Sequence, residues 1–229
     1  MPITSPHNAK LKEIRALHRR RERDERGRFV AEGEDLIDAA EAAGWRPIHK
    51  LVAAGSGLVG EEVEPELLGG ISTLGSGSRV VGVYEMRWAQ PAGPMCVALW
   101  GVGDPGNVGT VIRSALAFGV SSVVLGPDCA DPYSPKAVRA SMGAIFAVPV
   151  ARVSAIDELP GEIVGLAARS GEVLRGGTAD PVTIVVGAER TGLGSEAEAA
   201  CDRLAHIPIR SESLNAAMAA TIALYEVTR

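Results

Sequence analysis

The chain has 229 residues, of which 46% are hydrophobic and 22% charged, and its formal net charge is −5. These values are typical of a globular protein of one or two domains and exclude a disordered chain. No apolar stretch is long enough to span a bilayer, and the N-terminus lacks the apolar segment of a signal peptide, so we expect a cytoplasmic protein without a membrane partner. The three cysteines and four histidines never fall at ligand spacing, so neither a disulfide framework nor a metal site is expected.

Positive charge is concentrated near the N-terminus. Residues 1–30 hold nine Lys and Arg against four Asp and Glu, although the whole chain is acidic. Residues 8–25 are predicted to form one helix, because apolar residues recur there roughly one turn apart. Its later part carries Arg19, Arg20 and Arg21 among Glu and Asp. This pattern fits an anchor for an RNA backbone, and it also fits an ordinary solvated helix face.

The first part of the chain predicts a small α/β unit. A short strand is expected around Phe29 and Val30, followed by a helix over 34–43 that ends at a glycine. Two further strands are expected at 48–54 and 79–85. A stretch with two prolines and no periodicity follows and is interpreted as a linker, so we expect a first domain of residues 1–88.

The remainder, residues 89–229, is predicted to be a second domain in which strands and helices alternate. The apolar runs of strand length lie at 95–100, 121–126, 162–168, 182–189 and 203–209. Because continuous apolarity marks strands buried on both faces, these runs predict a parallel sheet covered by helices. The expected fold class is therefore α/β.

The last helix is predicted to have two kinds of surface. Leu214, Met218, Ile222 and Tyr225 fall on one helical face, while alanines fill much of the rest. Such a small-residue helix permits close approach of a partner, such as a second subunit.

A glycine pattern precedes the first long helix of this domain. Residues 101–106 match G-x-G-x-x-G, and Asp128 follows at the distance of a ribose-binding acid, as in nicotinamide-binding turns. The helix is expected to bury a face that runs from Val108 to Leu116, leaving Asn107 at its start and Arg113 on another face. These two groups suit a phosphate or carboxylate, but an N-cap and a surface arginine are the simpler alternative.

Two more polar segments follow predicted strands, where ligands gather in open α/β sheets. One is G-A-E-R-T-G, with Gly187 and Glu189. The other is I-P-I-R-S-E-S-L-N, with Ser213 and Asn215 at the start of the last helix. Taken singly, the first also fits a loop and the second an ordinary helix cap.

In this order and at these separations, the three segments resemble the SpoU family, also called TrmH, of RNA ribose 2'-O-methyltransferases. The matching residues are 107–113, 187–193 and 207–215. The resemblance implies a parallel-sheet domain with a deep trefoil knot, S-adenosylmethionine as cofactor, and a homodimer packed partly through the last helix. It favours this family over the nicotinamide-binding interpretation, which leaves the second and third segments unexplained.

The resemblance also implies roles for single residues. Gly187, Ile207 and Leu214 are expected to contact the cofactor. The expected reaction-site residues are Asn107, Glu189, Ser213, Asn215 and Arg113, the last of which is the proposed catalytic residue of the family. Because an arginine stays protonated, binding a phosphate is a milder role for it than acting as a base. Arg139 lies in a connecting segment that also resembles the family, and we expect it to contact RNA.

The N-terminal part, through "GRFVAEGEDLIDAAEAAGW", resembles the ribosomal-protein-like substrate-binding domain of members that act on ribosomal RNA. We therefore expect methylation of a ribose in structured RNA, with large-subunit ribosomal RNA favoured over tRNA. The segment between Ile207 and Asn215 is shorter than in most members. A non-catalytic RNA-binding relative is the alternative that this shortening leaves open, and an NAD-dependent oxidoreductase is a remote one.

Overall fold

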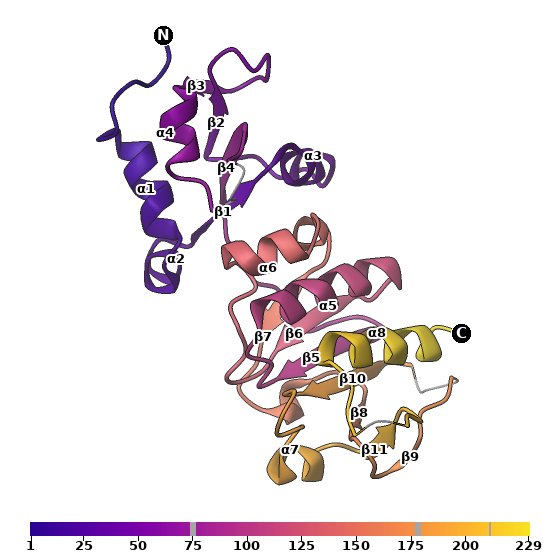
Figure 1. The fold of residues 1–229 in the computed structure, drawn as a ribbon. Helices are drawn as coiled ribbons and strands as arrows, with labels where there is room; N and C mark the ends of the chain where they lie inside the picture. The colour runs from indigo at the N-terminus through magenta and orange to yellow at the C-terminus, as the bar shows by residue number, and fades with distance from the viewer. Residues whose placement is uncertain (74–76, 177–179, 211) are drawn as a thin grey trace. The chain divides into compact units, whose positions relative to one another are not determined.

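The structure is a computed structural model that describes residues 1–73, 77–176, 180–210 and 212–229. The chain forms two compact units (Figure 1). Unit 1 comprises Met1–Met86 and Asp131–Ala147, and unit 2 comprises Arg87–Ala130 and Val148–Arg229. A segment from the middle of the chain therefore packs with the N-terminal residues.

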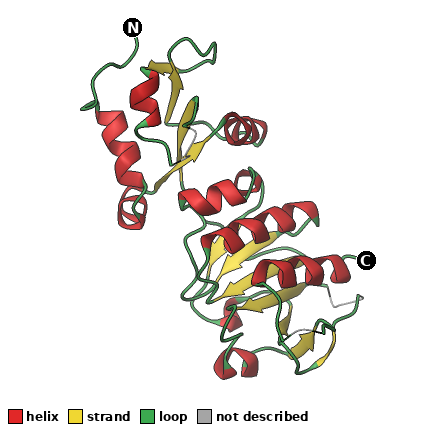
Figure 2. Ribbon diagram, in the orientation of Figure 1, coloured by secondary structure: helices red, strands yellow, loops and turns green. Residues whose placement is uncertain are grey.

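Unit 1 is built on a four-stranded sheet (Figure 2). Its strand order is β1-β4-β2-β3, with β1 (Arg28–Glu32), β2 (His49–Ala53), β3 (Glu61–Val63) and β4 (Val80–Glu85). Strand β4 is antiparallel to β1 and β2, and β2 is parallel to β3. Helical segments of this unit are α1 (Ala9–Leu17), α2 (Arg20–Arg26), α3 (Glu34–Ala42), α4 (Pro65–Gly69), α6 (Pro135–Ala140) and the 3-10 turn η1 (Ala144–Phe146).

The single helix expected over 8–25 is wrong, because the chain changes direction after α1. Helix α1 ends at Leu17, Arg19 is extended with φ −94° and ψ 134°, and α2 then begins. The reason is Arg23, which is buried and donates to the Leu17 carbonyl at 2.8 Å and to the Asp131 carboxylate. A continuous helix would leave this guanidinium without these partners.

Aromatic side chains fill the part of unit 1 where residues 131–147 join it. Phe29, Trp45, Tyr84, Tyr133 and Phe146 stack with ring centroids 4.8 to 6.4 Å apart. The Trp45 indole nitrogen donates to the Phe146 carbonyl at 2.8 Å. Burial, with a smaller contribution from Glu41, raises the pKa of Tyr84 to about 12. Two of the five rings come from the inserted segment, which therefore completes this core.

Unit 2 is the parallel-sheet domain predicted from the sequence. Its seven strands have the order β7-β6-β5-β10-β8-β11-β9, and every described pairing is parallel. The strands are β5 (Met95–Trp100), β6 (Ser122–Leu125), β7 (Val150–Arg152), β8 (Glu162–Leu166), β9 (Glu172–Val173), β10 (Val182–Gly187) and β11 (Arg203–His206). The sequence did not predict β7 and β9, which are too short to show a pattern.

The helical segments of unit 2 flank this sheet, and they are α5 (Pro105–Ala117), η2 (Ile156–Glu158), α7 (Ser195–Ala199) and α8 (Ala216–Val227). Helices α5 and α8 lie side by side, joined by a 2.7 Å hydrogen bond between Ser114 and Thr221 (Figure 1). In the described part of the chain, no helix has the length and apolarity needed to cross a membrane.

The two faces of α8 are arranged differently from the sequence-based expectation. The alanine face is buried inside the unit, through Ala216, Ala217, Ala220 and Ala223. The larger apolar residues point outward: Met218 is 62% exposed, Ile222 40% and Tyr225 52%. On α5 the predicted apolar face is correct except at Leu116, which is 49% exposed. The small alanine side chains let α8 pack closely against α5 and the sheet. The larger apolar side chains of α8 are therefore left on the surface of the unit.

Candidate active site

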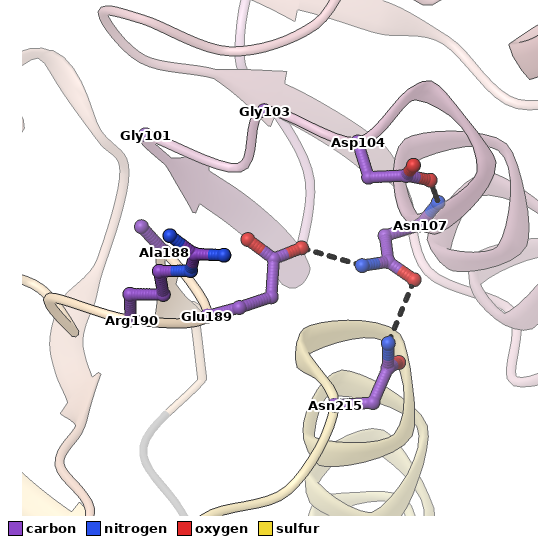
Figure 3. Close-up of a pocket in the computed structure, with 8 residues that line it drawn as sticks. All are labelled: Gly101, Gly103, Asp104, Asn107, Ala188, Glu189, Arg190 and Asn215. Carbon is purple, nitrogen blue, oxygen red and sulfur yellow. Dashed lines mark hydrogen bonds between the residues drawn. The ribbon is translucent and has the colours of Figure 1, made fainter.

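Two adjoining cavities lie at the carboxyl ends of the central strands of unit 2. The outer cleft is lined by residues from the turns after β5 and β10 and from the start of α8: Gly101, Gly103, Asp104, Asn107, Ala188, Glu189, Arg190 and Asn215 (Figure 3). The inner cavity has a volume of about 340 Å³ and lies against the ends of β8, β10 and β11. The two share Ala188, Glu189 and Arg190, so they adjoin each other.

Three predicted site residues form one hydrogen-bonded group in the outer cleft. The Asn107 side-chain amide donates to the Glu189 carboxylate, and the Asn215 amide donates to the Asn107 carbonyl oxygen at 3.0 Å (Figure 3). The three residues come from α5, the turn after β10 and the start of α8. The sheet therefore joins side chains that are more than 80 positions apart in the sequence.

Helix caps explain why these amides are available. Asp104, not Asn107, caps α5, because its carboxylate accepts from the Asn107 backbone N–H at 3.0 Å. The interpretation of Asn107 as an N-cap is therefore wrong, and its side chain is left to bind Glu189. Asn215 caps α8, because its side-chain oxygen accepts from the N–H groups of Ala217 and Met218. Its side-chain nitrogen is left to donate to Asn107. A cap bond thus fixes the orientation of its amide.

A tight turn after β10 positions Glu189 and Arg190. Ala188 and Gly192 exchange two backbone hydrogen bonds of 3.0 Å, which bring the chain back against Gly187. A Cβ on Gly187 would lie 2.3 Å from the Gly192 carbonyl carbon, closer than packing allows. Glycine is required here because backbone approaches backbone.

The inner cavity contains all three residues predicted to contact a cofactor. Gly187, Ile207 and Leu214 line it, together with Glu189 and Ser213. Its walls are otherwise largely apolar, with Glu212 as a second carboxylate and Arg190 as a cation. Apolar walls suit an aromatic base, exposed backbone suits hydrogen bonding to its edge, and carboxylates suit a cationic group. The chemistry of these groups fits a nucleoside that carries positive charge.

Comparison with known proteins agrees with this geometry. Residues 94–225 match the family described as the SpoU rRNA Methylase family. The chain belongs to the SpoU rRNA methylase family. Residues 8–83 match the MRM3-like substrate binding domain. The family resemblance predicted from the sequence is thus confirmed for both parts of the chain.

Several SpoU relatives are similar along nearly the whole chain. A crystal structure of an AdoMet-bound rRNA methyltransferase from Sinorhizobium meliloti is 33% identical with a TM-score of 0.88, covering 99% of this chain and 96% of that one. The SpoU methyltransferase AviRb from Streptomyces viridochromogenes, in complex with AdoMet, is 29% identical with a TM-score of 0.85 and 97% coverage of both chains. The 23S rRNA (guanosine(2553)-2'-O)-methyltransferase RlmP of Bacillus subtilis is 29% identical over 98% of both sequences.

The remaining predicted SpoU site residues are not among those that line the two cavities. Arg113 is exposed on α5 and lines neither of them. Arg139 is exposed on α6, in unit 1. Arg19, the N-cap of α2, and Arg20 and Arg21 at its start each lie within 3.6 Å of an acidic side chain of that helix. Ser211, in the polar segment before the last helix, lies outside the described residues.

Several residues that line the SpoU cavities were not predicted from the sequence. They are Asp104, Arg190, Glu212 and the segment from Leu166 to Ala168. A signal for the last of these was present, because residues 162–168 were recognised as a strand and ligands gather after such strands. Arg190 was not predicted, because it occupies a position between the glutamate and the glycine that the family pattern leaves unspecified.

Two of the cysteine side chains, Cys129 and Cys201, have raised pKa values. Burial raises the pKa of Cys129, and burial with neighbouring Asp202 and Glu198 raises the pKa of Cys201 to about 11. Both therefore remain neutral thiols and are poor nucleophiles. Among the described residues, no group of three or more His, Cys, Asp and Glu side chains is placed to hold a metal ion.

Proposed function

We propose that this protein transfers a methyl group from S-adenosylmethionine to a ribose 2'-hydroxyl of 23S ribosomal RNA, in the cytoplasm. The observation that carries the proposal is the inner cavity, which opens directly beside the group of Asn107, Glu189 and Asn215. Ribosomal RNA is favoured over tRNA because full-length relatives are named as rRNA enzymes and the substrate-binding domain is matched as well.

The inner cavity is the proposed cofactor site. When bound, S-adenosylmethionine supplies a methyl group that is already activated by its sulfonium. Ile207 and Leu214 would contact the adenine, and the backbone at Gly187 would hydrogen-bond the nucleoside. The carboxylates of Glu189 and Glu212 would attract the positive charge of the cofactor. The shortened segment before Asn215 retains this lining, which supports catalysis over a non-catalytic role.

The hydrogen-bonded group in the outer cleft is proposed to orient the ribose. Asn107 binds one oxygen of Glu189, so the other is left to accept a hydrogen bond from the 2'-hydroxyl. This places the hydroxyl at the junction of the two cavities and polarises it toward losing its proton. Ser213 lines the inner cavity nearby and is proposed to complete the reaction site.

We propose a homodimer that covers the exposed apolar residues of α5 and α8. Leu116, Met218, Ile222 and Tyr225 form this surface, which a second copy of the chain can bury. Arg113 is exposed on α5 close to this surface, and we propose that it reaches the outer cleft of the partner and binds an RNA phosphate there. The deep trefoil knot implied by the family resemblance is also proposed for the C-terminal part of unit 2.

The domain roles follow the predicted division. Residues 1–88 are proposed to bind RNA, with Arg19, Arg20 and Arg21 as backbone contacts, and residues 89–229 to transfer the methyl group. Arg139, which belongs to the second range in sequence, is proposed as a further RNA contact. Residues 131–147 belong to unit 1, which supports a shared RNA-binding role for Arg139 and the N-terminal arginines.

Binding and activity together test the proposal. Isothermal titration with S-adenosylmethionine should give saturable binding in the wild-type protein and in Arg113→Ala. Tritiated methyl should then enter an unmodified 23S rRNA transcript but not a tRNA transcript. Methylation of tRNA would show that tRNA, and not 23S rRNA, is the substrate. Failure to bind the cofactor even with 23S rRNA present would refute the proposed methyltransferase activity.

A mixing experiment tests the dimer and the role of Arg113. The variants Arg113→Ala and Asn215→Ala should each be inactive alone, because each lacks one part of every site. Mixing them should restore about a quarter of the activity, since half of the dimers then contain one intact site. No recovery on mixing, with subunit exchange shown separately, would place Arg113 in the site of its own chain.

A further inference from the structure

Three arginines follow the ends of three neighbouring strands in unit 2. Arg169 comes three residues after β8, Arg190 three after β10, and Arg210 four after β11. The strands are adjacent in the order β10-β8-β11 and all are parallel, so their carboxyl ends lie at one edge of the sheet. We call these residues the arginine rim.

One member of the arginine rim lines the proposed cofactor site, and the other two are sequence neighbours of residues that line it. Arg190 lines both cavities, on the same side of the outer cleft as Glu189 (Figure 3). Arg169 and Arg210 directly follow Ala168 and Ile209, which line the inner cavity. Consecutive Cα atoms are about 3.8 Å apart, so each rim residue is within one residue of the cavity wall or part of it.

The rim guanidinium groups are exposed and have no hydrogen-bond or ion-pair partner within the described ranges, 1–73, 77–176, 180–210 and 212–229. Two other arginines of unit 2 are engaged, unlike the exposed Arg113 and Arg175. Arg203 binds Glu162 and Glu172, both at 2.8 Å, and Arg152 stacks on Trp88. A free guanidinium presents several donors in a planar fork that matches phosphate.

We propose that the arginine rim binds consecutive phosphates of the RNA strand that carries the target ribose. The inference deepens the proposed function and rests on it. Neighbouring strands are about 4.8 Å apart, so three strands span about 10 Å, which is the length of about three stacked nucleotides. The protein has a net charge of −5, so its attraction for RNA depends on local groups of arginine and lysine side chains that are not paired with carboxylates.

The rim would hold the strand so that the ribose enters the outer cleft. Glu189 in the cleft is bound to Asn107, and its carboxylate faces the hydroxyl in our proposal. The phosphates that flank this ribose would be repelled by the Glu189 carboxylate. The positively charged guanidinium groups of the rim would attract them. Recognition of the backbone gives position and affinity without base specificity.

The decisive experiment compares the triple variant R169Q/R190Q/R210Q with the wild-type protein. RNA affinity is measured by filter binding of an unmodified 23S rRNA transcript over about 50 to 300 mM KCl. The triple variant should bind about tenfold or more weakly at low salt, and its plot of log K against log salt should be shallower by about 2, since three phosphate contacts are lost. Affinity for S-adenosylmethionine is measured in parallel by isothermal titration, because Arg190 also lines the inner cavity.

Two controls separate charge from geometry and position. R169K/R190K/R210K keeps the charges and should recover the salt slope but only part of the affinity, because lysine lacks the planar fork. R175Q removes an exposed arginine of the same unit whose neighbour Gly176 lies against the Glu226 carbonyl at the end of α8. It should leave both RNA affinity and salt slope unchanged.

The outcomes distinguish this inference from the proposed function. An unchanged salt slope in the triple variant, with methyl transfer intact, would overturn the rim and leave the methyltransferase standing. Loss of S-adenosylmethionine binding with RNA affinity unchanged would also overturn it, because the rim would then bind the cofactor's own carboxylate. Rim-dependent RNA binding without methyl transfer in the wild-type protein would support the rim and refute the proposed function.

Discussion

The arginines of α2 and those of the arginine rim differ in what surrounds them. On α2, Arg19, Arg20 and Arg21 lie 3.5, 3.6 and 2.7 Å from carboxylates one turn along the same helix. The rim arginines have no such partner among the described residues. Basic residues that are dense in the sequence are interleaved with acids and pair with them. Basic residues that are scattered in the sequence are gathered by a parallel sheet and remain available.

The comparison has a third member, Arg23, in the middle of α2. It is 3% exposed and binds Asp131 and a backbone carbonyl. Three environments therefore give three roles: a buried pair holds the fold, exposed pairs contribute little to stability, and free groups are ready for a ligand. Variants of each group should therefore show whether environment or local charge density decides the role of an arginine.

The largest effect is expected for the buried arginine. Arg23→Ala leaves the Asp131 carboxylate buried without its partner, so the free energy of unfolding should fall by about 3–5 kcal/mol. Thermal denaturation monitored by circular dichroism measures it. Arg21→Ala on the same helix should change stability by less than about 1 kcal/mol. Equal losses in the two variants would contradict the distinction.

The next effect is on catalysis. Arg190→Glu replaces a free cation at the mouth of both cavities with an anion, which should lower kcat/KM for 23S rRNA about ten- to a hundredfold through loss of a charged hydrogen bond. Steady-state methyl transfer under varied RNA concentration is the measurement. An effect confined to the KM for S-adenosylmethionine would point away from phosphate.

A smaller effect should appear when the α2 arginines are released from their partners. The variant E22Q/D24N/E25Q removes three carboxylates that face them, and RNA affinity should rise about three- to tenfold. Filter binding at low salt measures the change.

The matched control is E62Q/E64Q/E66Q, which makes the same change in net charge on exposed positions of β3 and the start of α4. A rise that is equal in both variants would reflect net charge alone. No rise in either would count against RNA contact by Arg19, Arg20 and Arg21.

The smallest effect concerns pH. Burial lowers the pKa of His18 from its ordinary value of 6.5, despite opposition from Glu32. The neutral ring is favoured in the folded state, so its contribution to stability is complete above pH 6.5 and is lost as pH falls toward the lowered pKa. His18→Gln should lose less stability than the wild-type protein between about pH 7.5 and about pH 5.5. His7→Gln, at an exposed histidine, should behave as the wild type does.

Much of the fold followed from local sequence patterns. The apolar run at 95–100 coincides with β5, and each of the other predicted strands of unit 2 appears with shorter bounds. These runs are informative because a parallel strand buried on both faces is apolar at every position. Strands of two or three residues, such as β9 and β7, contain too little pattern to be recognised.

Long-range packing is where prediction failed. The burial of Arg23 depends on Asp131, 108 positions away, and the ring of Trp45 meets Phe146 across 101 positions. Neither contact leaves a local trace, so the break after α1 and the place of residues 131–147 in unit 1 were not foreseen. Likewise, the composition of α8 indicated two faces, but only packing decides which face is buried.

The candidate site was predicted in part. Asn107, Glu189 and Asn215 were identified from a family resemblance, and their hydrogen bonds now join them. Arg190 was not, because a charged residue in a loop carries no signal until its neighbours in space are known. The roles of all these residues remain predictions.

The most direct test is to locate the methyl group. An unmodified 23S rRNA transcript is incubated with S-adenosylmethionine and either the wild-type protein or Glu189→Gln, and the RNA is then digested and analysed by nucleoside mass spectrometry. We expect one 2'-O-methylated nucleoside with the wild type and a rate about a hundredfold lower with the variant, which weakens the acceptor for the hydroxyl proton. A methyl group on a base, no modified ribose at all, or an undiminished rate in Glu189→Gln would contradict the account.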